Sequence, residues 1–148
     1  MKKTLVAALA LACAGLAPLA TAGGQQVRAE VSPDGQALVV RSYRCGTPSS
    51  LSLRGSAEGI VAGERRRVDL AVDAAPEPGV FRIARQWPSG GRWAVVLTVS
   101  GERGVSTLVT LEPGTPLRIA EQQQSFDKPS ADRIAAALAG SPAAPAAR

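Results

Sequence analysis

Hydrophobic and polar residues alternate over short stretches through most of this chain, and turn-forming residues separate the stretches. An alternation with a period of two places successive side chains on opposite faces of a β-strand. Proline and glycine between the stretches favour turns, as in Ser32-Pro33-Asp34-Gly35. The pattern predicts seven strands, at 27–31, 37–43, 50–54, 67–72, 80–87, 93–99 and 105–111. Short strands at this spacing are typical of a β-sandwich.

The pattern changes towards the C-terminus. Residues 116–126 predict an edge strand and a polar connector, and a short helix is expected within 127–140. Its boundaries are marked by an N-cap, an acidic first turn and a glycine stop, at Ser130, Asp132 and Gly140. Ile134 and Leu138 form an apolar stripe, which we expect to pack on the sandwich or, alternatively, on a partner. The Pro/Ala-rich residues 141–148 predict a disordered tail.

The first 22 residues have the features of a bacterial export signal. Lys2 and Lys3 precede an apolar stretch at 5–17, and Ala20-Thr21-Ala22 provides a small-x-small cleavage site. The stretch is shorter than the about 20 residues that span a bilayer core. Two alternatives remain open, namely acylation of Cys13 and retention of the whole segment as an anchor. We expect cleavage of residues 1–22, a β-sandwich domain at 23–126, and a periplasmic or secreted location.

Charge gives little support to a nucleic-acid partner. The whole chain has a formal net charge of +5, and loss of Lys2 and Lys3 lowers it to +3. Acidic residues are scattered among the basic ones, and no block of five or six like charges occurs. We therefore expect no nucleic acid among the partners.

The counts of cysteine, histidine and methionine restrict the chemistry. Cys45 is the only cysteine after residue 22, so the processed chain cannot form an internal disulfide. The chain has no histidine, and its single methionine is Met1. These counts remove the usual ligands of copper, zinc and haem, and the usual base of a nucleophilic pair. We therefore expect no cofactor, no metal site and no enzymatic activity.

One segment resembles a known family. In residues 77–99 a Pro-Gly turn introduces one strand, and a Gly-rich turn followed by tryptophan introduces the next. This arrangement resembles the small periplasmic immunoglobulin-like domains of the YtkA and FixH type. The resemblance covers about a quarter of the processed chain and implies an immunoglobulin-like β-sandwich. Some members of that group are linked to copper or to oxidase assembly, but this chain lacks the histidine and internal methionine of a metal-handling version.

Two tryptophans flank the loop between the fifth and sixth predicted strands. The strand phase places Trp87 and Trp93 with inward-facing residues, so we favour a role in the core. The alternative is an exposed aromatic pair beside Arg85 and Arg92, a surface suited to a glycan or a proline-rich peptide.

Cys45 lies where a strand gives way to a turn, next to Arg44. We favour a buried and inert thiol. The functional alternatives are an interchain disulfide and capture by a thiol-redox partner.

Arg65, Arg66 and Arg67 stand at the start of the predicted strand at 67–72. We favour the solvated beginning of a strand, with Glu58 and Glu64 offsetting part of the charge. In that case, changing Arg65 or Arg66 to serine shifts the folding free energy by at most about 0.5 kcal/mol. The alternative is a surface, formed by Arg65 and Arg66, that docks on an anionic lipid, a lipopolysaccharide or an acidic protein.

The sequence thus predicts an exported, non-enzymatic binding or assembly module that acts through a protein surface in the bacterial envelope. We expect an envelope protein as its partner, with contact to a membrane surface as a further option. The alternative function is a structural subunit of an envelope complex, held by Cys45 or by the C-terminal helix.

Overall fold

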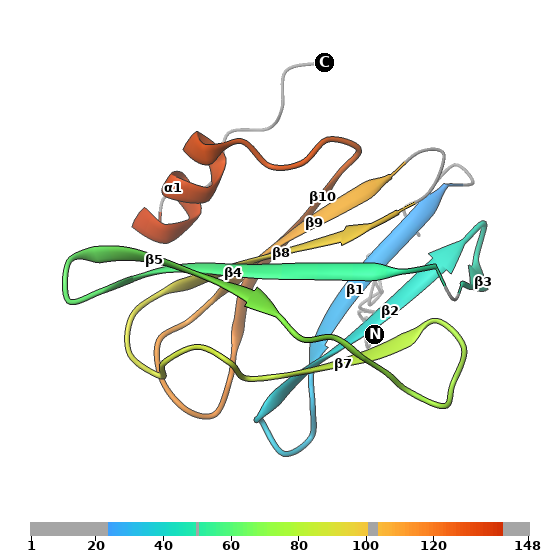
Figure 1. Ribbon diagram of the computed structural model, residues 1–148, viewed down its shortest axis with the longest axis horizontal. Helices are drawn as coiled ribbons and strands as arrows, with labels where there is room; N and C mark the ends of the chain where they lie inside the picture. Colours follow the sequence, from blue (N-terminus) through green and yellow to red (C-terminus); the bar gives the residue numbers. More distant parts are fainter. Residues whose placement is uncertain (1–23, 50, 101–103, 141–148) are drawn as a thin grey trace, which may run out of the picture.

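The computed structural model describes residues 24–49, 51–100 and 104–140 (Figure 1). The expected export signal with Cys13, and the expected tail at 141–148, lie outside these residues. No helix in the described part of the chain is long and apolar enough to cross a membrane.

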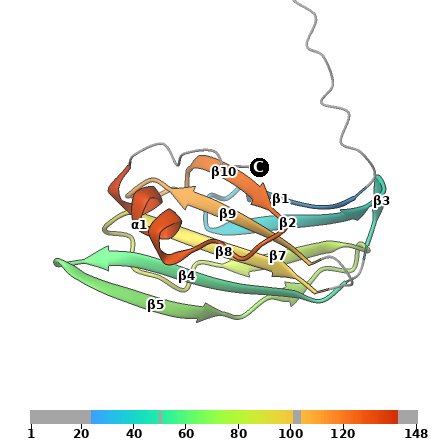
Figure 2. The same cartoon turned by 90° about the horizontal axis from the view of Figure 1, so that it is seen from above.

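Two antiparallel sheets pack together into a β-sandwich, which confirms the expected all-β fold (Figures 1 and 2). The first sheet consists of β1 (Gln25–Val31), β2 (Ala37–Arg44), β3 (Thr47–Pro48), β6 (Asp73–Ala74) and β7 (Val80–Ala84). The second consists of β4 (Leu53–Val61), β5 (Glu64–Leu70), β8 (Trp93–Val99), β9 (Val105–Leu111) and β10 (Ile119–Ser125).

The strand order is that of an immunoglobulin domain with one strand added. The first sheet runs β1-β2-β7-β6, with β3 paired to β2, and the second runs β10-β9-β8-β4-β5. These orders correspond to the two sheets of an immunoglobulin domain in which β4 is the third strand and β5 is an additional hairpin strand after it. The extra strand, β10, lies beyond β9 at the far edge of the second sheet.

Strands β8 and β9 have the predicted bounds, but the hairpin of β4 and β5 does not. The strand predicted at 50–54 runs from Leu53 to Val61, and the strand predicted at 67–72 begins at Glu64. Charged residues and two glycines interrupt the hydrophobic alternation in these strands, so the pattern did not predict their full length. Pairing of β4 with both β5 and β8 stabilises them. A two-residue turn joins them, in which Ala62 and Gly63 have φ values of 52° and 82°.

The main core lies between the two sheets and includes both tryptophans. Trp93 is 1% exposed and Trp87 is 4% exposed, with ring centroids 6.4 Å apart. A Cβ atom at Gly59 would lie 2.4 Å from the Trp93 ring, so only glycine leaves room for this ring above β4. The two rings fill the core, as favoured from the strand phase. The predicted strand at 80–87 ends at Ala84, and Trp87 enters the core from the following loop.

A short helix, α1 (Ala131–Ala139), covers part of the outer face of the second sheet (Figure 2). The Ser130 hydroxyl accepts a hydrogen bond from the Arg133 N–H at 3.3 Å, and Gly140 ends the helix in the left-handed conformation. Ile134 and Leu138 pack, with Ala137, on a second apolar cluster of the sheet: Ala94, Val96 and Leu108. The stripe therefore packs on its own domain.

Glutamine side chains of β10 join the two sheets along one side of the sandwich. The Gln124 side-chain oxygen accepts a hydrogen bond from the Val27 N–H at 3.0 Å, and the Gln122 oxygen accepts one from the Ala29 N–H at 2.7 Å. The Gln124 amide also donates to the carbonyl of Gln25 at 3.1 Å. We call these contacts the glutamine seam. Its side-chain amides take the place that a neighbouring strand would occupy beside β1.

Candidate functional site

The three consecutive arginines lie within β5, which is an edge strand of the second sheet. The strand begins at Glu64, three residues before the predicted start, so the arginines lie in its exposed first half. Arg65 and Arg67 project from the outer face with Asp69, whereas Arg66 projects from the opposite face. Their side chains are 47%, 58% and 54% exposed, in chain order. Because Arg65 and Arg66 lie on opposite faces, they do not form a single surface patch.

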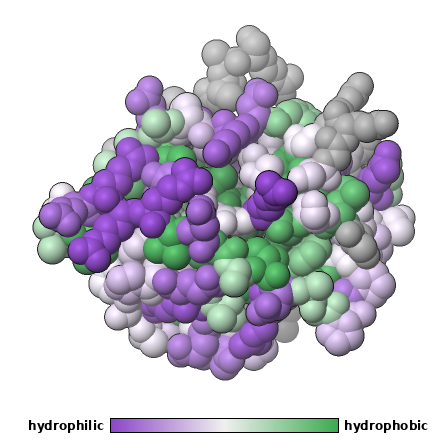
Figure 3. All heavy atoms as spheres, in the orientation of Figure 1, coloured by the Kyte–Doolittle hydropathy of each residue, from purple (hydrophilic) through white to green (hydrophobic). Residues whose placement is uncertain are grey.

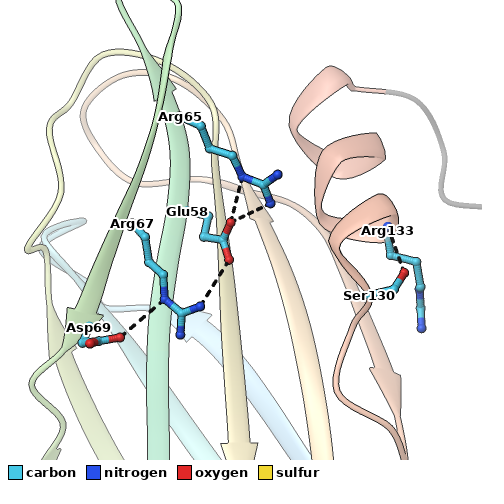
Figure 4. Close-up of polar contacts among 6 residues, drawn as sticks. All are labelled: Glu58, Arg65, Arg67, Asp69, Ser130 and Arg133. Carbon is cyan, nitrogen blue, oxygen red and sulfur yellow. Dashed lines mark hydrogen bonds and ion pairs between the residues drawn. The ribbon is translucent and has the colours of Figure 1, made fainter.

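Glu58 of β4 binds the two arginines of the outer face (Figure 4). The Arg65 guanidinium donates two hydrogen bonds to one Glu58 oxygen, from Nε at 3.0 Å and from Nη2 at 2.7 Å. Arg67 Nη1 lies 3.8 Å from the other Glu58 oxygen, and Arg67 Nε lies 3.6 Å from Asp69. The Glu58 side chain is only 11% exposed, so this largely buried carboxylate depends on Arg65 for its hydrogen bonds.

The remaining arginine has a weaker partner. Arg66 Nη2 lies 3.8 Å from Glu64 Oε2, and both side chains are mostly exposed. The carboxylates expected to offset the charge, Glu58 and Glu64, therefore do so.

A groove of about 640 Å³ lies on the outer face of the second sheet beside this cluster. Its polar lining comprises Arg54, Ser56, Arg67, Asp69, Thr98 and Lys128. Its apolar lining comprises Leu53, Leu70, Val72 and Val96, of which only Val72 is not buried. Within the described ranges, no carboxylate forms an ion pair with Arg54 or Lys128. Figure 3 shows hydrophilic side chains gathered over the β4–β5 hairpin, with apolar atoms beside them. We call the groove of about 640 Å³ the basic groove.

The four residues considered for an aromatic surface have structural roles instead. Both tryptophans are buried in the core, so they do not form an exposed aromatic pair. Arg85 donates hydrogen bonds to the carbonyls of Trp87, Pro88 and Gly114 at 3.2, 3.1 and 2.9 Å, and partial burial lowers the pKa of its guanidinium.

Arg92 lies at the C-terminal end of α1. A Cβ atom at Gly140 would meet its Nη1 at 2.7 Å. A cation there is favoured by the partial negative charge of the helix end, and the last turn of the helix has no basic residue of its own.

Cys45 is exposed, so the favoured interpretation of a buried thiol is wrong. The residue follows the last position of β2 and has a φ of 51°, within the turn that leads to β3. This turn carries the side chain away from the sandwich. An accessible thiol is available to a partner, whereas a buried one is not.

Arg54 and Lys128 were missed in the sequence as members of one surface. Lys128 precedes α1 and is far from Arg54 in sequence, so no spacing rule connects them. Glu58 was expected to offset the arginines, and a hairpin turn at Ala62-Gly63 would also have identified its cross-strand neighbour, because that turn places Glu58 directly opposite Arg67.

Comparison with protein-family models, with curated proteins and with solved structures found no match. Among the described residues, no three His, Cys, Asp or Glu side chains come together in a way that could hold a metal ion.

Proposed function

We propose that this protein is an exported, non-enzymatic binding or assembly module of the bacterial envelope, which recognises an acidic partner protein through the outer face of the β4–β5 hairpin. The observation that carries the proposal is the basic groove. Three cations, Arg54, Arg67 and Lys128, line it with one carboxylate, Asp69.

The lining of the groove combines two kinds of interaction. Val72, which is only partly buried, offers apolar surface that a ligand can bury, and the cations around it fix the orientation of acidic groups. The volume of about 640 Å³ falls within the range of about 300 to 1,000 Å³ that is usual for ligand sites. Unpaired cations also attract an acidic partner before contact, which raises the association rate at low salt.

The test is affinity purification of the tagged protein from its native envelope, with two double variants. Arg54→Ser/Lys128→Ser removes two groove cations, and Arg28→Ser/Arg118→Ser removes the same charge from exposed sites that do not line the groove. We expect the groove variant to lose its partner at physiological salt and the control to retain it. Equal recovery by the two variants contradicts the proposal, as does binding to anionic vesicles alone.

A second candidate function is favoured by the exposure of Cys45, namely a structural subunit held by an interchain disulfide. It predicts a disulfide-linked species on non-reducing electrophoresis of the native envelope, which Cys45→Ser removes. A monomer in both samples contradicts it. The C-terminal helix offers no such attachment through its apolar stripe, because Ile134 and Leu138 are buried on the sheet.

A further inference from the structure

The backbone of β5 presents free hydrogen-bonding groups along the edge of the second sheet. The two-residue turn makes Val61 and Glu64 a hydrogen-bonded pair, and such pairs alternate with non-bonded pairs along an antiparallel ladder. The pairs that involve Arg65, Arg67 and Asp69 are therefore the non-bonded ones. The N–H and C=O groups of these three residues point away from β4.

The contacts of Ala71 agree with this phase, since it is the next residue in the same series. Its N–H donates to the Gln86 side-chain oxygen at 2.9 Å, and its C=O accepts from the Gln86 amide at 2.9 Å. One glutamine side chain thus occupies the place of a neighbouring strand beyond the end of β5. No hydrogen bond from other described residues reaches the outward backbone groups of Arg65, Arg67 or Asp69.

The other sheet edges are covered or short. The glutamine seam covers β1, and β1 and β10 lie beside each other. The edge strand β6 has only two residues. Among the longer strands in the described part of the chain, β5 has β4 as its neighbour on one side, and no strand pairs with its other edge.

We propose that β5 binds an extended acidic segment of the partner protein, which adds to the second sheet as a further strand. Outward N–H and C=O groups give such a segment its backbone hydrogen bonds. Arg65 and Arg67 flank these groups on one face, where alternate Asp or Glu side chains of the segment lie opposite them. The inference rests on the proposed function, because it takes the acidic partner from it.

The same charges argue against a second copy of this chain as the occupant. Antiparallel pairing of β5 with β5 centred on Arg66 places each arginine opposite an arginine. Pairing centred on Arg67 places Arg67 opposite Arg67, while Arg65 faces Asp69. Like charges opposite each other destabilise a sheet, so each of these registers has at least one unfavourable pair. Charged edge strands commonly prevent association of identical chains in this way. An acidic strand offers carboxylates to both Arg65 and Arg67 without an arginine–arginine pair, so the charges favour it over a copy of β5.

The experiment measures binding of a fluorescent peptide, acetyl-(Glu-Thr)₄-amide, to the purified protein by anisotropy at low salt. Asp69→Pro removes an outward N–H from β5, and Asp69→Ser removes the same carboxylate but keeps the N–H. Proline is tolerated on an edge strand where its nitrogen faces solvent. We expect Asp69→Ser to bind at least as tightly as the wild type, and Asp69→Pro to bind about tenfold more weakly or worse.

Two modified peptides test the same contacts without changing the protein. One is N-methylated on every Glu and the other on every Thr, so each loses the N–H groups of one edge and keeps its charge. Strand addition uses one edge only, so one of these peptides should lose about tenfold or more in affinity and the other should bind as before.

Equal binding of the two modified peptides, or of the two Asp69 variants, overturns strand addition. So does an absence of peptide binding at low salt, tighter binding to phosphatidylglycerol vesicles than to the peptide, or dimerisation of the protein through β5. These failures are separate from failure of the proposed function. If the peptide result is negative while Arg54→Ser/Lys128→Ser still loses the native partner, the partner binds in the basic groove without adding a strand.

Discussion

Replacement of Arg65 by serine should destabilise the fold more than replacement of Arg66, although both arginines are exposed. Arg65 makes two hydrogen bonds to Glu58, whose side chain is 11% exposed, whereas Arg66 has one contact of 3.8 Å to an exposed carboxylate. Hydrogen bonds to a charged group contribute about 1.5–3 kcal/mol. Because Arg65 is itself 47% exposed and Arg67 lies close enough to replace it in part, we expect a loss of about 1 kcal/mol.

Arg66→Ser should change the free energy of unfolding by no more than about 0.5 kcal/mol, as the solvated-strand interpretation predicts. For Arg65 we expect a larger effect than the solvated-strand interpretation predicts, because the structure places its partner Glu58 in a largely buried position. Urea denaturation measures both variants. A loss of about 1 kcal/mol lowers the midpoint by about 0.5 M if the slope is about 2 kcal/mol per molar urea.

A double-mutant cycle assigns the effect to the pair. Glu58→Gln alone and with Arg65→Ser should give a coupling energy of about 1 kcal/mol, and the same cycle with Arg66→Ser should give a value near zero. If Arg65 and Arg66 cost the same amount, or if Arg65 shows no coupling to Glu58, the contact seen in Figure 4 does not stabilise the hairpin and our reasoning is wrong.

Three further predictions concern other parts of the molecule. Gly59→Ala should cost about 2 kcal/mol or more and alter tryptophan fluorescence, because its Cβ would lie 2.4 Å from the Trp93 ring; unchanged stability in urea contradicts this. Asp34 has a pKa lowered to about 2 by the Ser32 hydroxyl, so its stabilising contribution is present above about pH 4 and lost as the pH falls towards 2. The stability difference between wild type and Asp34→Asn should therefore shrink over this window in pH-dependent unfolding. Gln124→Leu should speed hydrogen exchange at the Val27 amide and leave Val95, in the core of the second sheet, unaffected.

The sequence pattern was most reliable where apolar residues alternate without interruption. Strands β8 and β9 have the predicted bounds, and the helix begins and ends at the expected caps. The pattern failed at β4, where Glu58 and Gly59 do not look like strand residues. Each is explained by a tertiary neighbour, Arg65 for the carboxylate and Trp93 for the glycine, and such neighbours are not visible in local composition.

The candidate site was less accessible to sequence reasoning than the fold. The three arginines attracted attention because they are consecutive, but a strand sends consecutive side chains to opposite faces. The groove depends on Arg54 and Lys128, which the fold brings together from β4 and from the segment before α1. Exposure of Cys45 likewise follows from the direction of one turn.

The glutamine seam has a consequence for the order in which the domain assembles. Its hydrogen bonds join residues that are 97 and 93 positions apart in the chain. The edge of β1 is therefore covered by side chains of β10. Closing so long a loop is slow, and it gains nothing until the strands between are in place. A fragment that ends before Gln122 therefore leaves backbone N–H groups of β1 without hydrogen-bond partners and leaves β9 without most of β10 as its neighbour. Exposed strand edges of this kind make such a fragment prone to aggregate. During synthesis, the edge of β1 therefore stays uncovered until Gln122 and Gln124 have been made.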